Sequence, residues 1–132
     1  KFVATRAGST ACAALAARGI PTLLTAIYDP GQAIVAAAAG ATYIAPYLGR
    51  MNDAGRQGIA EVLAMHEVLV ATGSSTKVLL ASIRSVPDMV AVARHGVDCF
   101  TMAPEVAEQF FTDPTTAEAA RTFEDAIRET SA

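Results

Sequence analysis

The chain has 132 residues, of which 52% are hydrophobic and 17% charged, and its formal net charge is −3. This composition supports one modest domain with a buried core and excludes a disordered chain. The acidic balance gives no basic footprint for nucleic acid, and no apolar run reaches the roughly 18 to 20 residues that span a bilayer, so neither partner is expected.

Short apolar runs alternate with amphipathic helical patterns along the whole sequence. Strands are predicted at residues 1–5, 22–26, 42–47, 77–83 and 98–102. Helices are predicted at residues 8–18, 29–40, 59–72, 85–96 and 114–129, with a short one opening at residue 104 and a polar loop at 49–58. Asp29 followed by Pro30 is a typical helix start, and Gly19 and Gly40 are typical helix ends.

Strands that alternate with helices predict parallel pairing through right-handed crossovers, and nearly all-apolar strands are typical of a sheet covered on both faces. No glycine-rich phosphate loop follows a strand, which disfavours a nucleotide-binding sheet. The pattern therefore favours an α/β fold of the (β/α)8 TIM-barrel class. Five strands cannot close such a barrel, so we expect residues 1–132 to be the C-terminal part of one barrel domain, strands 4–8, with three β/α units preceding Lys1.

Polar side chains gather at the predicted C-terminal ends of the strands, where (β/α)8 barrels carry their chemistry. Thr25, Tyr47 and Ser82 lie at these ends, with Arg50 and Arg84 shortly after two of them. Arginine binds phosphate through paired, charge-assisted hydrogen bonds, and hydroxyl groups suit a polyhydroxylated ligand. These residues predict a site for a sugar phosphate, although a single arginine after a strand is more often a solvated charge.

The sequence has two lysines, and they occupy different places in the pattern. Lys77 comes first in its strand, at the non-catalytic end, and is expected to be a surface charge. Lys1 lies in an apolar strand, where desolvation would lower the pKa of the amine and make it a nucleophile. The alternative is that Lys1 is a solvated side chain at the first residue.

Cysteine and histidine indicate no metal site. Cys12 and Cys99 lie in apolar segments without metal-ligand spacing, which favours reduced, buried thiols in a cytoplasmic protein. His66 and His95 lie on predicted helices without carboxylate or cysteine at ligand spacing, so we interpret them as packing or surface residues. No secretory signal pattern is visible at the start of the sequence.

Several segments together resemble the fructose-6-phosphate aldolase and small transaldolase family. They are Lys-Phe-Val-Ala-Thr at 1–5, Gly-Ile-Pro-Thr-Leu-Leu-Thr-Ala-Ile-Tyr at 19–28 with Gln32, Ala-Gly-Ala-Thr-Tyr-Ile-Ala-Pro-Tyr-Leu-Gly-Arg at 39–50, and Val-Leu-Leu-Ala-Ser-Ile-Arg at 78–84. The match runs without gaps to about residue 112. The Ala-Pro-Tyr-x-x-Arg and Ala-Ser-Ile-Arg elements at this spacing are its most specific part.

The resemblance implies a class I aldolase mechanism on a (β/α)8 barrel, with no cofactor and no metal. Lys1 falls on the Schiff-base lysine, and Val3 replaces the proline of the usual Lys-x-Pro-x-Thr. Thr25 falls on the threonine that holds a catalytic water. Substrate-binding positions are matched by Arg50 and Ser82 for phosphate, Arg84 beside them, and Leu23 and Ala45 as pocket lining.

Tyr47 favours one activity within the family, because the aldolases carry tyrosine where transaldolases tend to carry phenylalanine. We therefore expect reversible cleavage of fructose 6-phosphate to dihydroxyacetone and glyceraldehyde 3-phosphate. The alternative is transaldolase transfer of the dihydroxyacetone unit, towards which the segments around Arg50 and Ser82 point. An aspartate, a Thr/Asn pair and a Gln or Glu of the family's first three strands have no match in this chain.

Two alternatives to a single-chain barrel enzyme remain open. A non-catalytic, doubly wound α/β ligand-binding module would need neither a reactive lysine nor further strands, and a half-barrel could fold by pairing with another chain. The last predicted helix carries Ala119, Phe123 and Ile127 at helical spacing, which is an apolar stripe. It either caps its own barrel or, as the resemblance implies, reaches a neighbouring subunit of a homo-oligomer.

Overall fold

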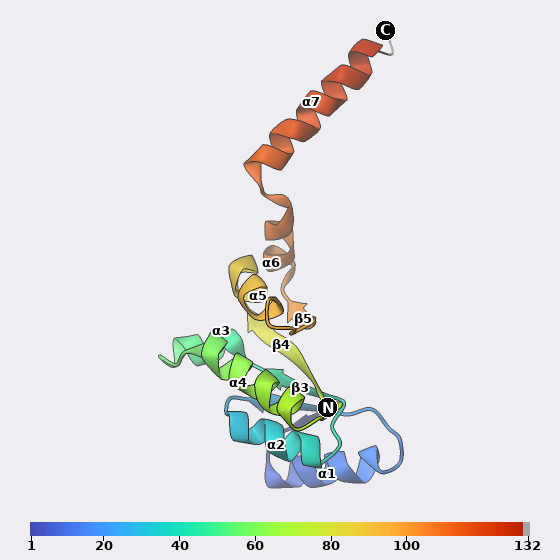
Figure 1. Ribbon diagram of the computed structural model, residues 1–132, viewed down its shortest axis with the longest axis vertical. Coiled ribbons are helices and arrows are strands. Elements are labelled where there is room, and N and C mark those ends of the chain that lie inside the picture. Colours follow the sequence, from blue (N-terminus) through green and yellow to red (C-terminus); the bar gives the residue numbers. More distant parts are fainter. Residues whose placement is uncertain (131–132) are drawn as a thin grey trace.

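The computed structural model describes residues 1–130, in which five strands alternate with helices (Figure 1). The strands are β1 (Phe2–Val3), β2 (Leu23–Ile27), β3 (Tyr43–Pro46), β4 (Lys77–Ile83) and β5 (Cys99–Met102). The helices are α1 (Arg6–Ala16), α2 (Pro30–Ala38), α3 (Leu48–Asp53), α4 (Gly58–Ala71), α5 (Val86–Ala93), α6 (Pro104–Glu108) with the 3-10 turn η1 (Gln109–Phe111), and α7 (Pro114–Thr130).

The five strands form one parallel sheet in the order β1-β2-β3-β4-β5. Each strand therefore pairs with the next one along the chain, as in successive units of a (β/α)8 barrel. The parallel pairing predicted from the alternation of elements is confirmed. Since all strands run the same way, their C-terminal ends meet at a single edge of the sheet, which we call the C-terminal rim.

One face of the sheet is covered by helices, whereas the other is open. Leu24, Ile44 and Leu80 are fully buried on the covered face. On the other face Val3 is 54% exposed and Leu79 is only half-buried. No described element packs on this face, so the covering that the apolar strands predict for it is not supplied by residues 1–130. That face has the apolar character of a barrel interior without the residues that would fill it.

Side-chain caps fix where several helices begin. The Thr5 hydroxyl accepts a hydrogen bond from the Gly8 N–H at 3.1 Å, so α1 begins at Arg6, two residues earlier than predicted. The helix start predicted at Asp29 and Pro30 is present. Asp29 and Gln32 form a capping box there, at the start of α2. The Ser85 hydroxyl caps α5 by accepting a hydrogen bond from the Asp88 N–H at 3.3 Å. These caps satisfy N–H groups that a helix start leaves without partners.

The prediction of a loop at residues 49–58 is wrong for the first half of that segment, where the chain forms α3 (Leu48–Asp53). Leu48 and Met51 are fully buried, so one turn of helix packs on the sheet edge even though its other residues are polar. The true loop is short and turns at Gly55, whose φ is +73°. The Asn52 side chain accepts a hydrogen bond from the Gly58 N–H at 3.0 Å and so leads into α4.

Helix α7 extends away from the body of the molecule (Figure 1). None of its residues is buried, and Phe123 is 68% exposed. The predicted apolar stripe is therefore present on a helix, but it does not cap the sheet of its own chain. Within residues 1–130, no helix combines the length and apolar character needed to cross a bilayer.

Candidate active site

The C-terminal rim brings three of the predicted site residues together from two neighbouring strands. Thr25 lies in β2, Tyr47 follows β3 directly, and Arg50 lies on α3 one turn later. The Thr25 and Tyr47 hydroxyl oxygens are 2.8 Å apart, so they share a hydrogen bond in which either group can donate. The Arg50 guanidinium carbon lies 4.8 Å from the centre of the Tyr47 ring. The predicted grouping of these three side chains is therefore present.

Thr25 and Ala45 lie in one row across the sheet, and Leu23 lies in a row two residues earlier. The strand register pairs Val3 with Thr25 and Thr25 with Ala45. Leu23 is half-buried and pairs with Tyr43. Since side chains two residues apart share a face, the two expected lining residues lie on the same face of the sheet as Thr25.

Irregular backbone marks this rim at two places. The parallel register shifts between Thr25 and Ile27 and again between Leu80 and Ile83. Ala26 and Ser82 occupy these shifts with φ values of +56° and +57°, a left-handed conformation that is unusual for residues with a Cβ. Bulges of this kind redirect side chains and are frequent beside active sites. Nothing in the sequence predicted them, because neither position is a glycine.

Gly49 allows α3 to lie against the end of β4. A Cβ atom at this position would be 2.5 Å from the Ser82 carbonyl oxygen and 2.7 Å from the Arg84 Nε. A side chain at this position would therefore clash with Ser82 of β4 and with Arg84, which follows that strand. The sequence offered a signal in a glycine inside the Tyr-x-x-Arg segment, but its role needed the structure.

The two arginines have different surroundings. Arg84 follows β4 and forms an ion pair with Asp53 at the end of α3, a partner that sequence reasoning missed. Arg50 is exposed, and its guanidinium carbon lies over the Tyr47 ring. Within residues 1–130 no hydrogen bond or ion pair engages the Arg50 guanidinium, so its N–H groups stay available for an anion. Ser82 is half-buried in β4 between these elements.

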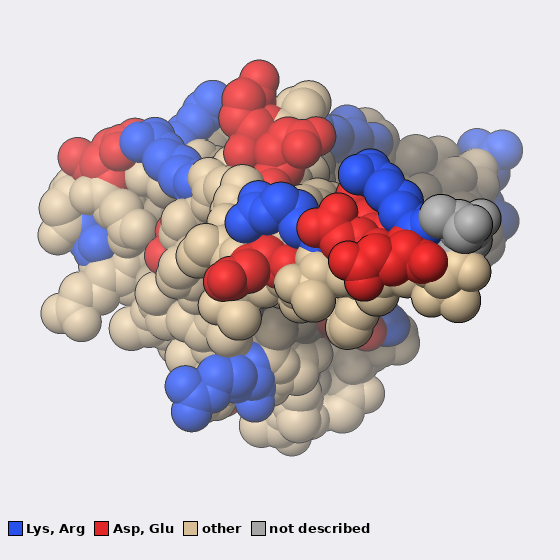
Figure 2. All heavy atoms as spheres, turned by 90° about the horizontal axis from the view of Figure 1, so that it is seen from above, with Lys and Arg blue, Asp and Glu red and all other residues tan. Residues whose placement is uncertain are grey.

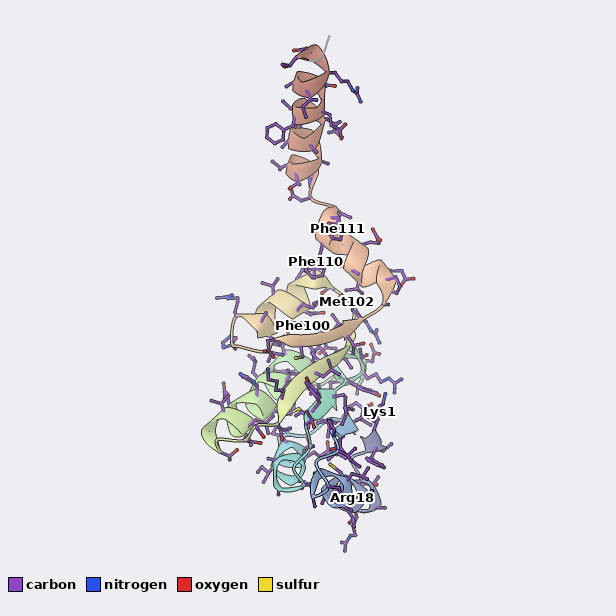
Figure 3. The ribbon with its side chains drawn as sticks, turned by 90° about the vertical axis from the view of Figure 1, so that its right-hand side faces the viewer. Lys1, Arg18, Phe100, Met102, Phe110 and Phe111 are labelled. Carbon is purple, nitrogen blue, oxygen red and sulfur yellow. The ribbon has the colours of Figure 1, made fainter. Side chains whose placement is uncertain are left out.

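Lys1 stands apart from this group in the described chain. It precedes β1, an outer strand of the sheet, and is exposed. Figure 3 shows it away from Phe100 and Met102 of β5, the outer strand on the other side. Its neighbour Val3 lies beside Thr25 in the register. No hydrogen bond or ion pair joins Lys1 to Thr25 or Tyr47 within residues 1–130. The desolvation expected for this amine is thus not provided by the described residues, since the face beside β1 is open.

Among the described residues, no three His, Cys, Asp or Glu side chains come together as metal ligands. His66 is half-buried on α4, and His95 is exposed after α5. Cys12 and Cys99 are both free thiols, the first buried and the second half-buried. Figure 2 shows acidic and basic side chains interspersed on the face seen from above, without one large patch of a single sign.

The opposite, N-terminal edge of the sheet carries an exposed ion pair. Lys77 Nζ lies 3.2 Å from Asp98 Oδ2, and the Cys99 thiol donates a hydrogen bond to the other carboxylate oxygen at 3.3 Å. The Cys99 thiol and then Lys77 lower the pKa of Asp98 from its ordinary value, and the Asp98 carboxylate raises the pKa of Lys77. A cleft of about 390 Å³ adjoins this pair beside His66. Lys77 is an exposed charge, as predicted.

The whole chain is similar to proteins of one known family. The model of the family described as transaldolase/fructose-6-phosphate aldolase matches residues 1–132. A protein of a Caulobacter species, named a probable transaldolase, is 38% identical over 116 residues, which are 88% of this chain and 54% of that protein. A Bartonella quintana protein with the same name is 35% identical over 130 residues, covering 98% of this chain and 60% of the relative. The chain spans about half the length of the curated relatives it matches.

Among solved structures, a mandelate oxidase variant superposes with a TM-score of 0.50 and 25% sequence identity, covering 71% of this chain and 29% of that one. The family is of the (β/α)8-barrel type, and five parallel strands joined by helices are five units of such a barrel. The predicted fold class and the predicted resemblance are confirmed. The chain belongs to the transaldolase/fructose-6-phosphate aldolase family.

Proposed function

We propose that the complete protein is a class I aldolase that reversibly cleaves fructose 6-phosphate to dihydroxyacetone and glyceraldehyde 3-phosphate. The observation that carries this proposal is the 2.8 Å contact between the Thr25 and Tyr47 hydroxyls at the C-terminal rim. A phenol held at this place can give and take protons during carbon–carbon cleavage. Membership of the family supports the reaction class, and the tyrosine at position 47 favours the aldolase over the transferase.

The proposed chemistry begins at Lys1. Its neutral amine attacks the C2 ketone, water leaves, and an iminium ion forms. The C3–C4 bond then breaks, its electron pair moves into the iminium to give an enamine, and the C4 hydroxyl loses its proton as glyceraldehyde 3-phosphate departs. Protonation of the enamine at C3 and hydrolysis of the iminium release dihydroxyacetone and restore Lys1. Tyr47, with a water held on Thr25, moves these protons.

The phosphate of the substrate is assigned to Arg50 and Ser82, with Arg84 beside them. The free edge of Arg50 supports this assignment, as does the close packing of Gly49 on Ser82 and Arg84. Asp53 partly neutralises Arg84, so Arg50 is the main phosphate partner in this proposal. Leu23 and Ala45 contribute apolar walls on the same face as Thr25.

Transaldolase activity is the second candidate, favoured by the names of the relatives. The two activities differ in the fate of the enamine, which a transaldolase passes to another aldose. The test uses the complete polypeptide and the variant Tyr47→Phe, measuring free dihydroxyacetone against transfer to erythrose 4-phosphate. Loss of the phenol should reduce release by about 100-fold or more and spare transfer, in line with the usual size of general acid–base effects. An unchanged ratio of the two products would contradict the assigned role of Tyr47.

We also propose that the complete protein is a cytoplasmic homo-oligomer. Two free thiols fit a reducing compartment, and the exposed Phe123 on the projecting α7 fits burial against a second copy. Sedimentation of the complete polypeptide and of the variant Phe123→Asp tests the oligomer. A monomeric wild type, or an unchanged assembly in the variant, would contradict it.

A further inference from the structure

Tyr28 stands at a rigid turn beside the candidate site. It follows β2 directly, and its N–H donates a hydrogen bond to Gln32 Oε1 at 2.8 Å. The Asp29 N–H donates to the same oxygen at 3.1 Å, while Asp29 Oδ1 accepts from the Gly31 N–H at 2.7 Å. Tyr28 also packs against the buried core. The capping box of α2 therefore fixes the backbone from which this ring projects.

The Tyr28 ring packs against the ring of Tyr47. The two ring centres are 5.8 Å apart and the ring planes meet at 79°, an edge-to-face arrangement. The Arg50 guanidinium contacts the same Tyr47 ring, and the Tyr47 hydroxyl is bonded to Thr25. Three neighbours, one in β2, one in the turn after β2 and one on α3, thus hold Tyr47, two of them through its ring and one through its hydroxyl.

We propose that Tyr28 is a positioning residue that holds the Tyr47 hydroxyl on Thr25 for proton transfer. The inference rests on the proposed function, because it assumes that the Tyr47 phenol moves protons. A general acid must stay within hydrogen-bond reach of its partner, and a ring that can change rotamer spends part of its time away from it. Tyr28 restricts that movement through its ring rather than through its hydroxyl.

This division between ring and hydroxyl makes the inference specific. Tyr28→Phe keeps the ring, so its kcat should stay within about twofold of wild type. Tyr28→Leu removes the edge-to-face contact. The loss expected for Tyr28→Leu is about 3- to 10-fold in kcat for dihydroxyacetone release, the size of an aromatic pair interaction. KM for fructose 6-phosphate should stay unchanged, because Tyr28 has no assigned contact with the substrate.

The decisive experiment is a double-mutant cycle on the complete polypeptide, with Tyr28→Leu made in wild type and in the Tyr47→Phe background. If Tyr28 acts through the Tyr47 hydroxyl, the Leu substitution costs nothing further once that hydroxyl is gone. An equal loss in both backgrounds would show a general structural effect and overturn the inference, as would an unchanged kcat in Tyr28→Leu. Tyr28→Met, which keeps apolar volume, replaces the Leu variant if that protein does not fold.

Failure of the inference can be told apart from failure of the proposed function. Borohydride trapping with dihydroxyacetone is done on every variant. An adduct on Lys1 together with a slow Tyr47→Phe enzyme, but no effect of Tyr28→Leu, would remove only the role of Tyr28. Absence of an adduct on the wild type, or full activity in Tyr47→Phe, would remove the function on which that role depends.

Discussion

The two ends of the sheet carry the same kinds of side chain and use them differently. At the N-terminal edge two threonine hydroxyls bond to the backbone: Thr42 Oγ1 accepts from the Thr22 N–H at 3.1 Å, and Thr76 Oγ1 donates to the Ala41 carbonyl at 2.7 Å. At the C-terminal rim the Thr25 hydroxyl bonds to the Tyr47 phenol. The difference teaches that Thr42 and Thr76 complete backbone hydrogen bonds, whereas the Thr25 hydroxyl is paired with a phenol, the contact on which the proposed proton transfer rests.

The charged residues differ between the two ends in one respect. Lys77 and Asp98 neutralise each other at the N-terminal edge, and both are exposed. The C-terminal rim also holds an ion pair, Arg84 with Asp53, but Arg50 beside it contacts the Tyr47 ring and has no carboxylate partner among residues 1–130. A cation without a carboxylate partner suits an incoming phosphate better than one that is already paired.

The largest expected effect separates the two lysines. Lys1→Met in the complete polypeptide should lower aldol cleavage by about 10⁴-fold or more, because it removes the amine that forms the proposed iminium. Lys77→Met is the matched control and should leave kcat/KM unchanged, since Lys77 is paired with Asp98 and has no assigned role in the reaction. Steady-state kinetics on both variants measure this, and equal losses in the two would contradict the role proposed for Lys1.

Phosphate recognition gives the next effect. Arg50→Lys keeps the charge but loses the planar fork and the stacking on Tyr47. The value of kcat/KM for fructose 6-phosphate should fall about 10- to 100-fold, while cleavage of unphosphorylated fructose should change much less. Kinetics on the two sugars give the comparison. Equal losses on both would place Arg50 outside the phosphate site.

Packing at the C-terminal rim gives a smaller effect. Gly49→Ala places a Cβ 2.5 Å from the Ser82 carbonyl, so α3 must shift from the end of β4. We expect a loss of about 1–3 kcal/mol in the free energy of unfolding and a raised KM for the phosphorylated substrate. Denaturant unfolding checks the first and kinetics the second. The control Gly19→Ala meets no atom within 4 Å and should raise no KM; a raised KM there would weaken the steric explanation.

The smallest expected effect is the change in Tm on breaking the Lys77–Asp98 ion pair at the N-terminal edge. The pKa of Asp98 is lowered, so its contribution to stability is present above the ordinary value of 3.8 and is lost as the pH falls through the folded-state pKa. The pKa of Lys77 is raised, so its contribution is present below 10.5 and is lost as the pH rises through the folded-state pKa. Asp98→Asn should therefore lower Tm slightly between about pH 4 and 10, and less in high salt. A drop in activity at neutral pH would contradict the division between the edges.

The sequence predicted the strands well because apolar β-branched runs and helix-starting pairs are local signals. The strand β4 (Lys77–Ile83) and the helix start at Asp29 and Pro30 are confirmed as predicted. The short helix α3 was missed because its two buried residues, Leu48 and Met51, stand in an otherwise polar segment. Its helical state comes from tertiary packing, which no local pattern contains.

The candidate site was predictable only in part. Thr25, Tyr47 and Arg50 were found because a strand end and a family motif mark them, and their contacts agree with that prediction. Tyr28 and Asp53 were missed, because an edge-to-face ring contact and an ion pair between α3 and the end of β4 depend on the fold. The roles of Lys1 and Ser82 stay predictions.

The central claim is that Lys1 forms the covalent intermediate, and borohydride trapping with dihydroxyacetone on the complete polypeptide tests it most directly. Peptide mass mapping then locates the reduced adduct. The account predicts one stable adduct, on the side chain of Lys1, and none on Lys77. A well-folded, complete protein that yields no adduct on Lys1 would contradict the account.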